Sequence, residues 1–239
     1  MKHTILFLFN SSHYAVQPWL DDGRFNCVSV DYEDTDHSGT ERPAQAHKSH
    51  YRLNIDLTEH GAMEIDRQLR VLGLASPSFV LSFTPCTDMA VCGNRSRASK
   101  LAKDPQLLDK ALALATLVEQ WPCPSIVENP VSLLATLWKP CDYVHPWHFA
   151  DLCPTGPHPE HPDVIPPQDR YNKKTGLWLT NGARMPVQTS FVEPDTKDFP
   201  GYTKLGGKSA KTKYIRSLTP RGMAKGIYLA NSQTKELIL

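Results

Sequence analysis

Short apolar runs alternate with longer segments along the chain, and each run has the length of a buried β-strand. Strands that alternate with helical segments are typical of an open α/β sheet with helices on both faces. The pattern therefore predicts an α/β fold with a mostly parallel sheet. The predicted strands are Thr4–Phe9, Cys27–Asp31, a weaker Tyr51–Ile55, Phe79–Phe83, Ser125–Val127 and Gly176–Leu179.

Two segments have helical patterns. Between Asp104 and Gln120, apolar side chains recur every three to four residues, and Pro105 suits a first helical turn. The second helix is predicted over Thr219–Ala230, with Thr219 as its cap and Pro220 just inside.

Two other segments are predicted to lack regular elements. Lys139–Asp169 is rich in proline, so we expect a long ordered loop or small lobe there, without a sheet strand. Asp195–Lys213 is polar and rich in glycine and lysine, which predicts a mobile loop. The expected organisation is a core over residues 1–138, the loop or lobe over 139–175, and a last strand, basic loop and helix over 176–239.

Composition narrows the class of protein. A length of 239 residues suffices for one large domain with a hydrophobic core. The 26 basic and 25 acidic side chains nearly balance, which excludes a polybasic nucleic-acid coat protein. The apolar run at the start is too short to span a membrane and precedes no cleavage site. With six cysteines and no secretion signal, we expect reduced thiols, a cytoplasmic location and no membrane association. No pattern points to an obligate protein partner.

One segment departs from this charge balance. It contains six basic residues within 18 positions and no acidic residue, which favours contact with a phosphate backbone over an ordinary solvated loop. These candidate nucleic-acid-binding residues are Lys204, Lys208, Lys211, Lys213, Arg216 and Arg221.

Two predicted strands end in reactive side chains. Cys86 follows Pro85 after one strand, and Glu128 with Asn129 ends the next. Open α/β sheets bind ligands at the carboxyl ends of their strands, so both side chains are expected at one site. A thiolate can add to carbon 6 of cytosine and make carbon 5 nucleophilic, while a carboxyl near ring nitrogen 3 stabilises the developing charge. This pair predicts covalent chemistry on a pyrimidine base.

Three blocks in order resemble DNA cytosine carbon-5 methyltransferases, in the compact form found in phages and mobile elements. Phe83–Gly93 resembles the Pro-Cys nucleophile loop, Val127–Val131 resembles the Glu-Asn motif, and Lys204–Gly222 resembles the tail of the compact subgroup. The resemblance implies a Rossmann-like methyltransferase fold, S-adenosylmethionine as cofactor, DNA as partner, and a role in self-protection against restriction.

The resemblance also assigns a cofactor site. It places S-adenosylmethionine at the turn after the first strand, with an acid after the second strand on the ribose and an acid after the third near the adenine. The turn contains no glycine, although glycine would allow close approach and positive φ; asparagine and serine also tolerate a tight turn. The residues implied are Phe9, Asn10, Ser11, Ser12, Asp31, Asp56 and Pro85.

The Gln-x-Arg-x-Arg stretch of the family has no clean match. Gln168–Arg170 and Lys173–Thr175 are both candidates, so Arg170 or Lys174 is expected to hold the base or its developing charge. The chain has room for only a small recognition region, and the target base must leave the stack to reach Cys86, which favours single-stranded or open DNA among possible substrates.

Three alternatives stay open at this point. The chain is a catalytically silent relative that binds DNA, or it modifies a free nucleotide or RNA, or it uses another one-carbon donor. In the proline-rich segment, six cysteine and histidine side chains invite a zinc site, but their spacing contains no tight Cys-x-x-Cys pair, and the prolines between them account equally well for a rigid loop without metal. They are Cys141, His145, His148, Cys153, His158 and His161.

Overall fold

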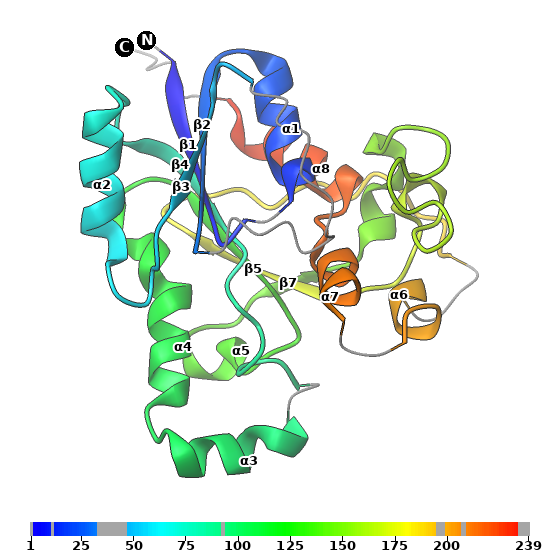
Figure 1. The fold of residues 1–239 in the computed structure, drawn as a ribbon. Helices are drawn as coiled ribbons and strands as arrows, with labels where there is room; N and C mark the ends of the chain where they lie inside the picture. The colour runs from blue at the N-terminus through cyan, green and yellow to red at the C-terminus, as the bar shows by residue number, and fades with distance from the viewer. Residues whose placement is uncertain are drawn as a thin grey trace.

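The computed structural model describes residues 2–10, 12–32, 47–91, 94–194, 199–206 and 209–233. Seven strands form one sheet in the order β3-β2-β1-β4-β5-β7-β6 (Figure 1). The first five strands are parallel, and β7 runs antiparallel to both β5 and β6. The strands are β1 His3–Leu8, β2 Phe25–Asp31, β3 His50–Asn54, β4 Pro77–Ser82, β5 Ser125–Pro130, β6 Asp142–Val144 and β7 Thr175–Thr180.

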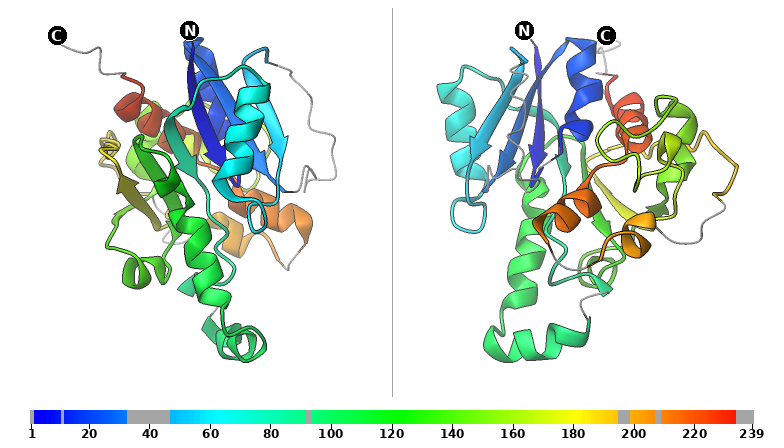
Figure 2. Two further views of the ribbon diagram at one scale, coloured as in Figure 1. Left: turned by 90° about the vertical axis from the view of Figure 1, so that its left-hand side faces the viewer. Right: turned by 45° about the vertical axis from the view of Figure 1, so that its right-hand side comes forward.

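Helices cover both faces of the sheet (Figures 1 and 2). On one face, α1 (His13–Asp22) and α8 (Arg221–Asn231) pack on alternate strand residues such as Ile5 and Phe7. On the other, α2 (Gly61–Val71) and α4 (Leu107–Thr116) pack on the residues between them. This two-sided burial explains why the strands are continuous apolar runs. The predicted α/β fold, a mostly parallel sheet with helices on both faces, is confirmed.

Helix boundaries differ from the predictions. The predicted helix Asp104–Gln120 is α4 followed by a 3₁₀ turn over Leu117–Gln120, and Pro105 precedes the helix. The sequence did not reveal α1, because Pro18 inside it interrupts the helical pattern. Thr219 does not cap α8: the N-cap residue is Pro220, without a side-chain bond.

Two predictions of irregular structure are wrong. The proline-rich segment contributes β6 to the edge of the sheet, because its short run Asp142–Val144 pairs with β7. The predicted loop Asp195–Lys213 contains α6 (Pro200–Thr203) and the start of α7 (Ala210–Ser217). Buried apolar side chains of α7, such as Ile215, pack with Ile165 of the proline-rich segment and with Phe199. Tertiary packing therefore orders the described parts of both segments, and residues 195–198 and 207–208 lie outside the described residues.

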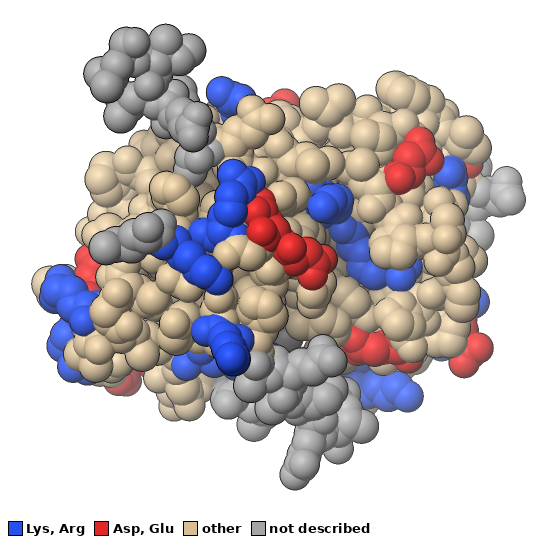
Figure 3. Space-filling view, turned by 90° about the horizontal axis from the view of Figure 1, so that it is seen from above, with Lys and Arg blue, Asp and Glu red and all other residues tan. Residues whose placement is uncertain are grey.

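The surface at the amino-terminal edge of the sheet carries mixed charge. In Figure 3, acidic and basic side chains lie beside one another on this face. In the part of the chain that is described, no helix has the length and apolar character needed to cross a membrane. None of the described cysteines forms a disulfide.

Candidate functional site

Cys86 and Glu128 come from neighbouring parallel strands. Strand β4 pairs with β5 in register, Ser82 opposite Val127, so both strands deliver their following residues to the same sheet edge. The Asn129 side-chain amide donates a 2.7 Å hydrogen bond to the carbonyl oxygen of Thr84. Asn129 is fully buried, and its side-chain oxygen has no partner among the described residues. The residue next to Glu128 thus holds the segment that leads into Cys86.

Cys86 opens a turn that is fixed to the continuation of β5. Its carbonyl oxygen accepts hydrogen bonds from the backbone N–H groups of Met89 and Ala90. The N–H of Val91 donates to Val131, and the N–H of Leu133 donates to Met89. The Cys86 side chain is partly exposed, as a nucleophile that meets a substrate must be.

Three other described thiols, those of Cys27, Cys123 and Cys153, are buried. Burial raises the pKa of Cys123 to about 11 and the pKa of Cys153 to about 12, and burial likewise raises the pKa of Cys27. A thiol of high pKa holds almost no thiolate at neutral pH and is inert as a nucleophile. These cysteines act as small apolar side chains of the core.

Glu128 lies in an environment that favours its neutral form. Removal from water raises the pKa of this carboxyl, and the positive charge of Lys173 partly opposes that effect. A carboxyl with a raised pKa retains its proton to higher pH and can then donate a hydrogen bond. Glu128 is thus suited to pair with a ring nitrogen that gains charge.

Within the two candidate stretches, Lys173 is the residue whose positive charge acts on the pKa of Glu128, and the predicted roles of Arg170 and Lys174 stay predictions. The Lys173 ammonium donates to the carbonyl oxygen of Arg216 at 3.0 Å, which anchors it beside β5. The Lys174 ammonium lies 4.4 Å from the ring centre of Tyr143. Arg170 forms an ion pair with Asp151 at 3.3 Å. Sequence reasoning placed Lys173 among the candidates, but only the register of β7 separates it from its neighbour.

The turn after β1 forms without glycine. Phe9 adopts φ of 52°, the left-handed conformation that glycine adopts at lower cost. The Asn10 side chain then closes the turn: its oxygen accepts from the N–H of Ser12 at 3.3 Å and its amide donates to Ser29 at 3.2 Å. Ser12 caps α1 by accepting from the N–H of Tyr14. Ser11 lies outside the described residues.

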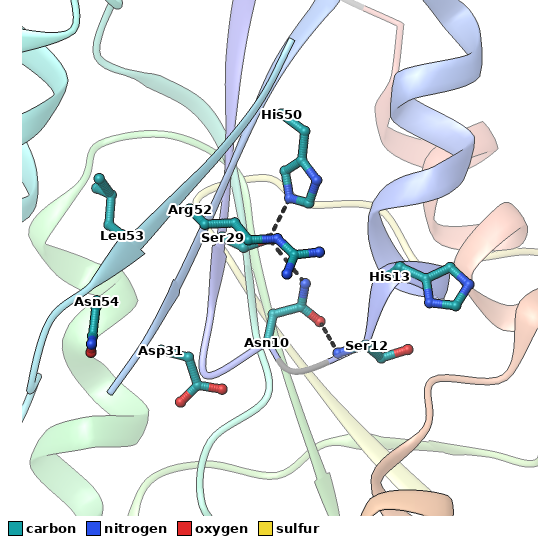
Figure 4. Close-up of a pocket in the computed structure, with 9 residues that line it drawn as sticks. All are labelled: Asn10, Ser12, His13, Ser29, Asp31, His50, Arg52, Leu53 and Asn54. Carbon is teal, nitrogen blue, oxygen red and sulfur yellow. Dashed lines mark hydrogen bonds between the residues drawn. The ribbon is translucent and has the colours of Figure 1, made fainter. Parts of the chain in front are cut away.

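A polar pocket lies beside this turn (Figure 4). It is open to solvent, has a cavity volume of about 70 Å³, and is lined by residues from the ends of β1 and β2, from β3 and from the start of α1. Its lining residues are Asn10, Ser12, His13, Ser29, Asp31, His50, Arg52, Leu53 and Asn54. Asp31, predicted for the cofactor site, is among them. His13, His50 and Arg52 were not predicted, because His13 begins α1 and the other two lie on β3, and only the tertiary structure brings these elements together.

Asp56 lies in a second hollow, which shares Asn54 with the first. Its carboxylate accepts hydrogen bonds from the hydroxyl and the N–H of Thr58, and these lower its pKa. Tyr32, with 61% of its surface exposed, and Ile55 line the same hollow. Together the two hollows follow the carboxyl ends of β2 and β3. Pro85 is exposed directly before Cys86.

The predicted phosphate-binding residues separate into two groups. Lys204, Lys211 and Lys213 are exposed, with Lys211 and Lys213 on α7. Arg216 instead donates to the carbonyl oxygens of Gly201 and Leu205. Lys208 lies outside the described residues.

Arg221 was predicted to contact DNA, but in the structure it forms an internal ion pair instead. Its side chain, 9% exposed, pairs with Asp169 at 2.7 Å, so the guanidinium does not face solvent. The same carboxylate accepts from the backbone N–H of Arg221 and so caps α8. Arg221 has a structural role here.

The six cysteine and histidine side chains of the proline-rich segment do not converge. His145 and His148 lie 5.4 Å apart between ring centres, and His158 and His161 lie 5.8 Å apart. Over the described ranges, no three metal-ligating side chains form a group that holds a metal ion.

Comparison with models of protein families gives no match, and comparison with curated proteins gives none. Among solved structures, the chain is similar to a mutant form of DNMT2 from Spodoptera frugiperda, with 14% sequence identity and a TM-score of 0.42. The alignment covers 83% of this chain and 56% of that one, so the chain spans little more than half of that protein's length. A likeness this distant assigns no activity to the chain.

Proposed function

We propose that the protein is a DNA cytosine carbon-5 methyltransferase that uses S-adenosylmethionine. The observation that carries this proposal is the delivery of Cys86 and Glu128 to one sheet edge by adjacent parallel strands, with Asn129 bonded to the segment before the thiol. A thiol and a carboxyl of raised pKa are the two groups that covalent activation of a cytosine ring requires.

Cys86 acts as the nucleophile. Its thiolate forms a bond to carbon 6 of the cytosine, and the electron pair of the 5,6 double bond makes carbon 5 nucleophilic. After carbon 5 has gained the methyl group, it loses its proton to water, the double bond re-forms and the thiolate leaves. The fixed turn after Cys86 keeps the sulfur in place for both steps.

Glu128 donates a hydrogen bond to ring nitrogen 3 as the ring accepts electrons. The raised pKa keeps the carboxyl protonated for this role, and Lys173 supplies a positive charge that stabilises the carboxylate if the proton moves to the ring. We assign to Lys173 the supporting role that the resemblance implied for Arg170 or Lys174.

The residues along β1 to β3 fit an adenosine-bearing cofactor. Asp31 and Asp56 supply acceptors for ribose hydroxyls and an adenine amine, and Tyr32 and Ile55 offer apolar faces to a base. When bound, S-adenosylmethionine supplies an electrophilic methyl group. Asn10 and Ser12 would bind its polar end beside the start of α1.

DNA is the proposed partner of the exposed lysines. Lys204, Lys211 and Lys213 come from the segment without acidic residues and are suited to phosphate contacts. The resemblance to phage and mobile-element enzymes supports a role in protecting DNA against restriction.

The test is nucleoside mass spectrometry after incubation with mixed-sequence DNA and methyl-labelled S-adenosylmethionine. We expect labelled 5-methylcytosine with the native chain and with Cys141→Ser, a matched thiol control, and none with Cys86→Ala. Label in the Cys86→Ala sample would overturn the mechanism. A folded native chain that binds DNA but transfers no label would instead support a silent relative, and label only on RNA would change the substrate.

A further inference from the structure

One arginine holds the turn that begins at Cys86. Arg97 lies on α3 (Asn94–Lys103), and its guanidinium donates to three successive carbonyl oxygens, those of Asp88 and Met89 at 3.3 Å and that of Ala90 at 2.9 Å. These are the carbonyl oxygens at the end of the turn whose first residue is the nucleophile. A guanidinium is planar and carries several donors, so it can bind adjacent acceptors that a lysine cannot bind together.

A second cation of the same helix reinforces this contact. The Lys100 ammonium pairs with the Asp88 carboxylate at 2.6 Å. The helix itself has no buried side chain among its described residues and projects away from the sheet (Figures 1 and 2). Such a polar helix gains little from apolar burial. Its contacts with the Cys86 turn are therefore a main attachment of α3 to the rest of the protein.

The turn is held from both ends. Upstream, Asn129 binds the carbonyl oxygen of Thr84 at 2.7 Å; downstream, Arg97 binds the oxygens of residues 88–90. Cys86 lies between these two points. Met89, fully buried, also accepts from the N–H of Leu133, so Arg97 and the segment after β5 meet at the same carbonyl oxygen.

We propose that Arg97 is a positioning residue that fixes the Cys86 thiol for attack, with Lys100 in support. The inference rests on the proposed function for its catalytic meaning, but the position of the thiol can be measured without catalysis. Removal of Arg97 takes a donor from each of these three carbonyl oxygens and leaves that of Met89 with only the N–H of Leu133, so the turn opens and the thiol spends more time exposed.

The experiment compares alkylation of Cys86 by iodoacetamide with methyl transfer. Arg97→Ala, Arg97→Lys and the native sequence are prepared with Cys92→Ser, so that the peptide containing Cys86 has one thiol. Arg67→Ala, which removes an arginine from an exposed pair on α2, serves as the control. Peptide mass spectrometry gives each alkylation rate as a function of pH, and the buried Cys123 and Cys153 report on unfolding.

For Arg97→Ala we expect alkylation of Cys86 to rise about threefold or more and methyl transfer to fall about tenfold or more, while Cys123 and Cys153 stay protected. Arg97→Lys should lie between native and alanine, because it keeps the charge but fewer of the bonds. Unchanged alkylation of Cys86 in folded Arg97→Ala overturns the inference. A different outcome would separate the two proposals. If the native chain transfers no methyl group but Arg97→Ala still changes the alkylation rate of Cys86, the proposed function is wrong and the positioning role of Arg97 stands.

Discussion

At the scale of single residues, the chemical properties of the site residues depend on their surroundings in the fold as well as on their residue type. Cys86 and Cys123 are the same side chain, but only Cys123 is buried, and its pKa is raised to about 11. Glu128 is an ordinary glutamate by sequence, and burial beside β7 gives it a raised pKa. Phe9 occupies a conformation that its residue type disfavours, because Asn10 closes the turn around it.

Glu128→Gln tests the carboxyl through both activity and stability. The raised pKa means that the folded protein binds the proton more tightly than the unfolded chain, so Glu128 reduces the free energy of unfolding as pH rises through that pKa. We expect Glu128→Gln to abolish most methyl transfer and to raise Tm by a few degrees at pH 8 but not at pH 4. An equal Tm change at both values would contradict the assigned cause.

The rate of methyl transfer by the native chain should depend on the protonation of Glu128. Because Glu128 acts in its protonated form, kcat should decline as pH rises through its raised pKa. Cys86 needs the opposite form, the thiolate, so the expected profile of kcat against pH is bell-shaped, and Glu128→Gln should lose only its alkaline limb. A profile that keeps both limbs in the variant would remove Glu128 from this role.

Asn10→Ala tests the glycine-free turn. The side chain is buried and makes two hydrogen bonds, so its loss should lower the free energy of unfolding by about 1–3 kcal/mol and weaken S-adenosylmethionine binding. Chemical denaturation and calorimetric titration measure the two effects. Gln17→Ala, an exposed polar control on α1, should leave both unchanged.

At the scale of elements, some helices are capped or packed by residues from distant parts of the chain, because their own sequence lacks a capping side chain or a strongly apolar face. Helix α8 begins at a proline that cannot cap it, and Asp169 from the proline-rich segment accepts the N–H of Arg221 instead. Helix α7 is polar by sequence, yet its inner side chains pack with Ile165 and Phe199. These contacts join the proline-rich segment to the basic helix.

Asp169→Ala should be strongly destabilising. It leaves the buried Arg221 guanidinium without its partner and uncaps α8, so we expect a loss of about 3–5 kcal/mol in the free energy of unfolding. The control is Asp151→Ala, which breaks the more exposed pair with Arg170 and should cost within about 1 kcal/mol. Similar losses for both variants in urea denaturation would show that burial does not govern the pair.

At the scale of the whole molecule, charge is balanced overall and unbalanced locally. The net charge is only +1, although Lys211 and Lys213 of α7 are both exposed and come from a segment without acidic residues. Nucleic-acid affinity should therefore depend on this local group.

Salt dependence measures that contribution. Each phosphate contact contributes about 0.9 to the slope of log affinity against log salt concentration for duplex DNA. We expect Lys211→Ala and Lys213→Ala each to reduce the slope by about that amount for any DNA sequence. Lys110→Ala, which removes an exposed lysine paired with Asp104, should leave the slope unchanged. An unchanged slope in the two α7 variants would place the DNA elsewhere.

The sequence by itself determined every strand of the sheet except β6, and it indicated the two reactive groups. Strands such as β4 and β5 can be predicted because burial on both faces makes them continuous apolar runs, and Cys86 and Glu128 can be predicted because Cys86 comes shortly after β4 and Glu128 lies near the carboxyl end of β5. Tertiary structure alone decided that the charge of Lys173 acts on the pKa of Glu128, that Arg221 turns inward to Asp169, and that Arg97 binds the Cys86 turn. Those choices join residues far apart in the chain, and only the packed register of β7, α8 and α3 determines which side chains meet.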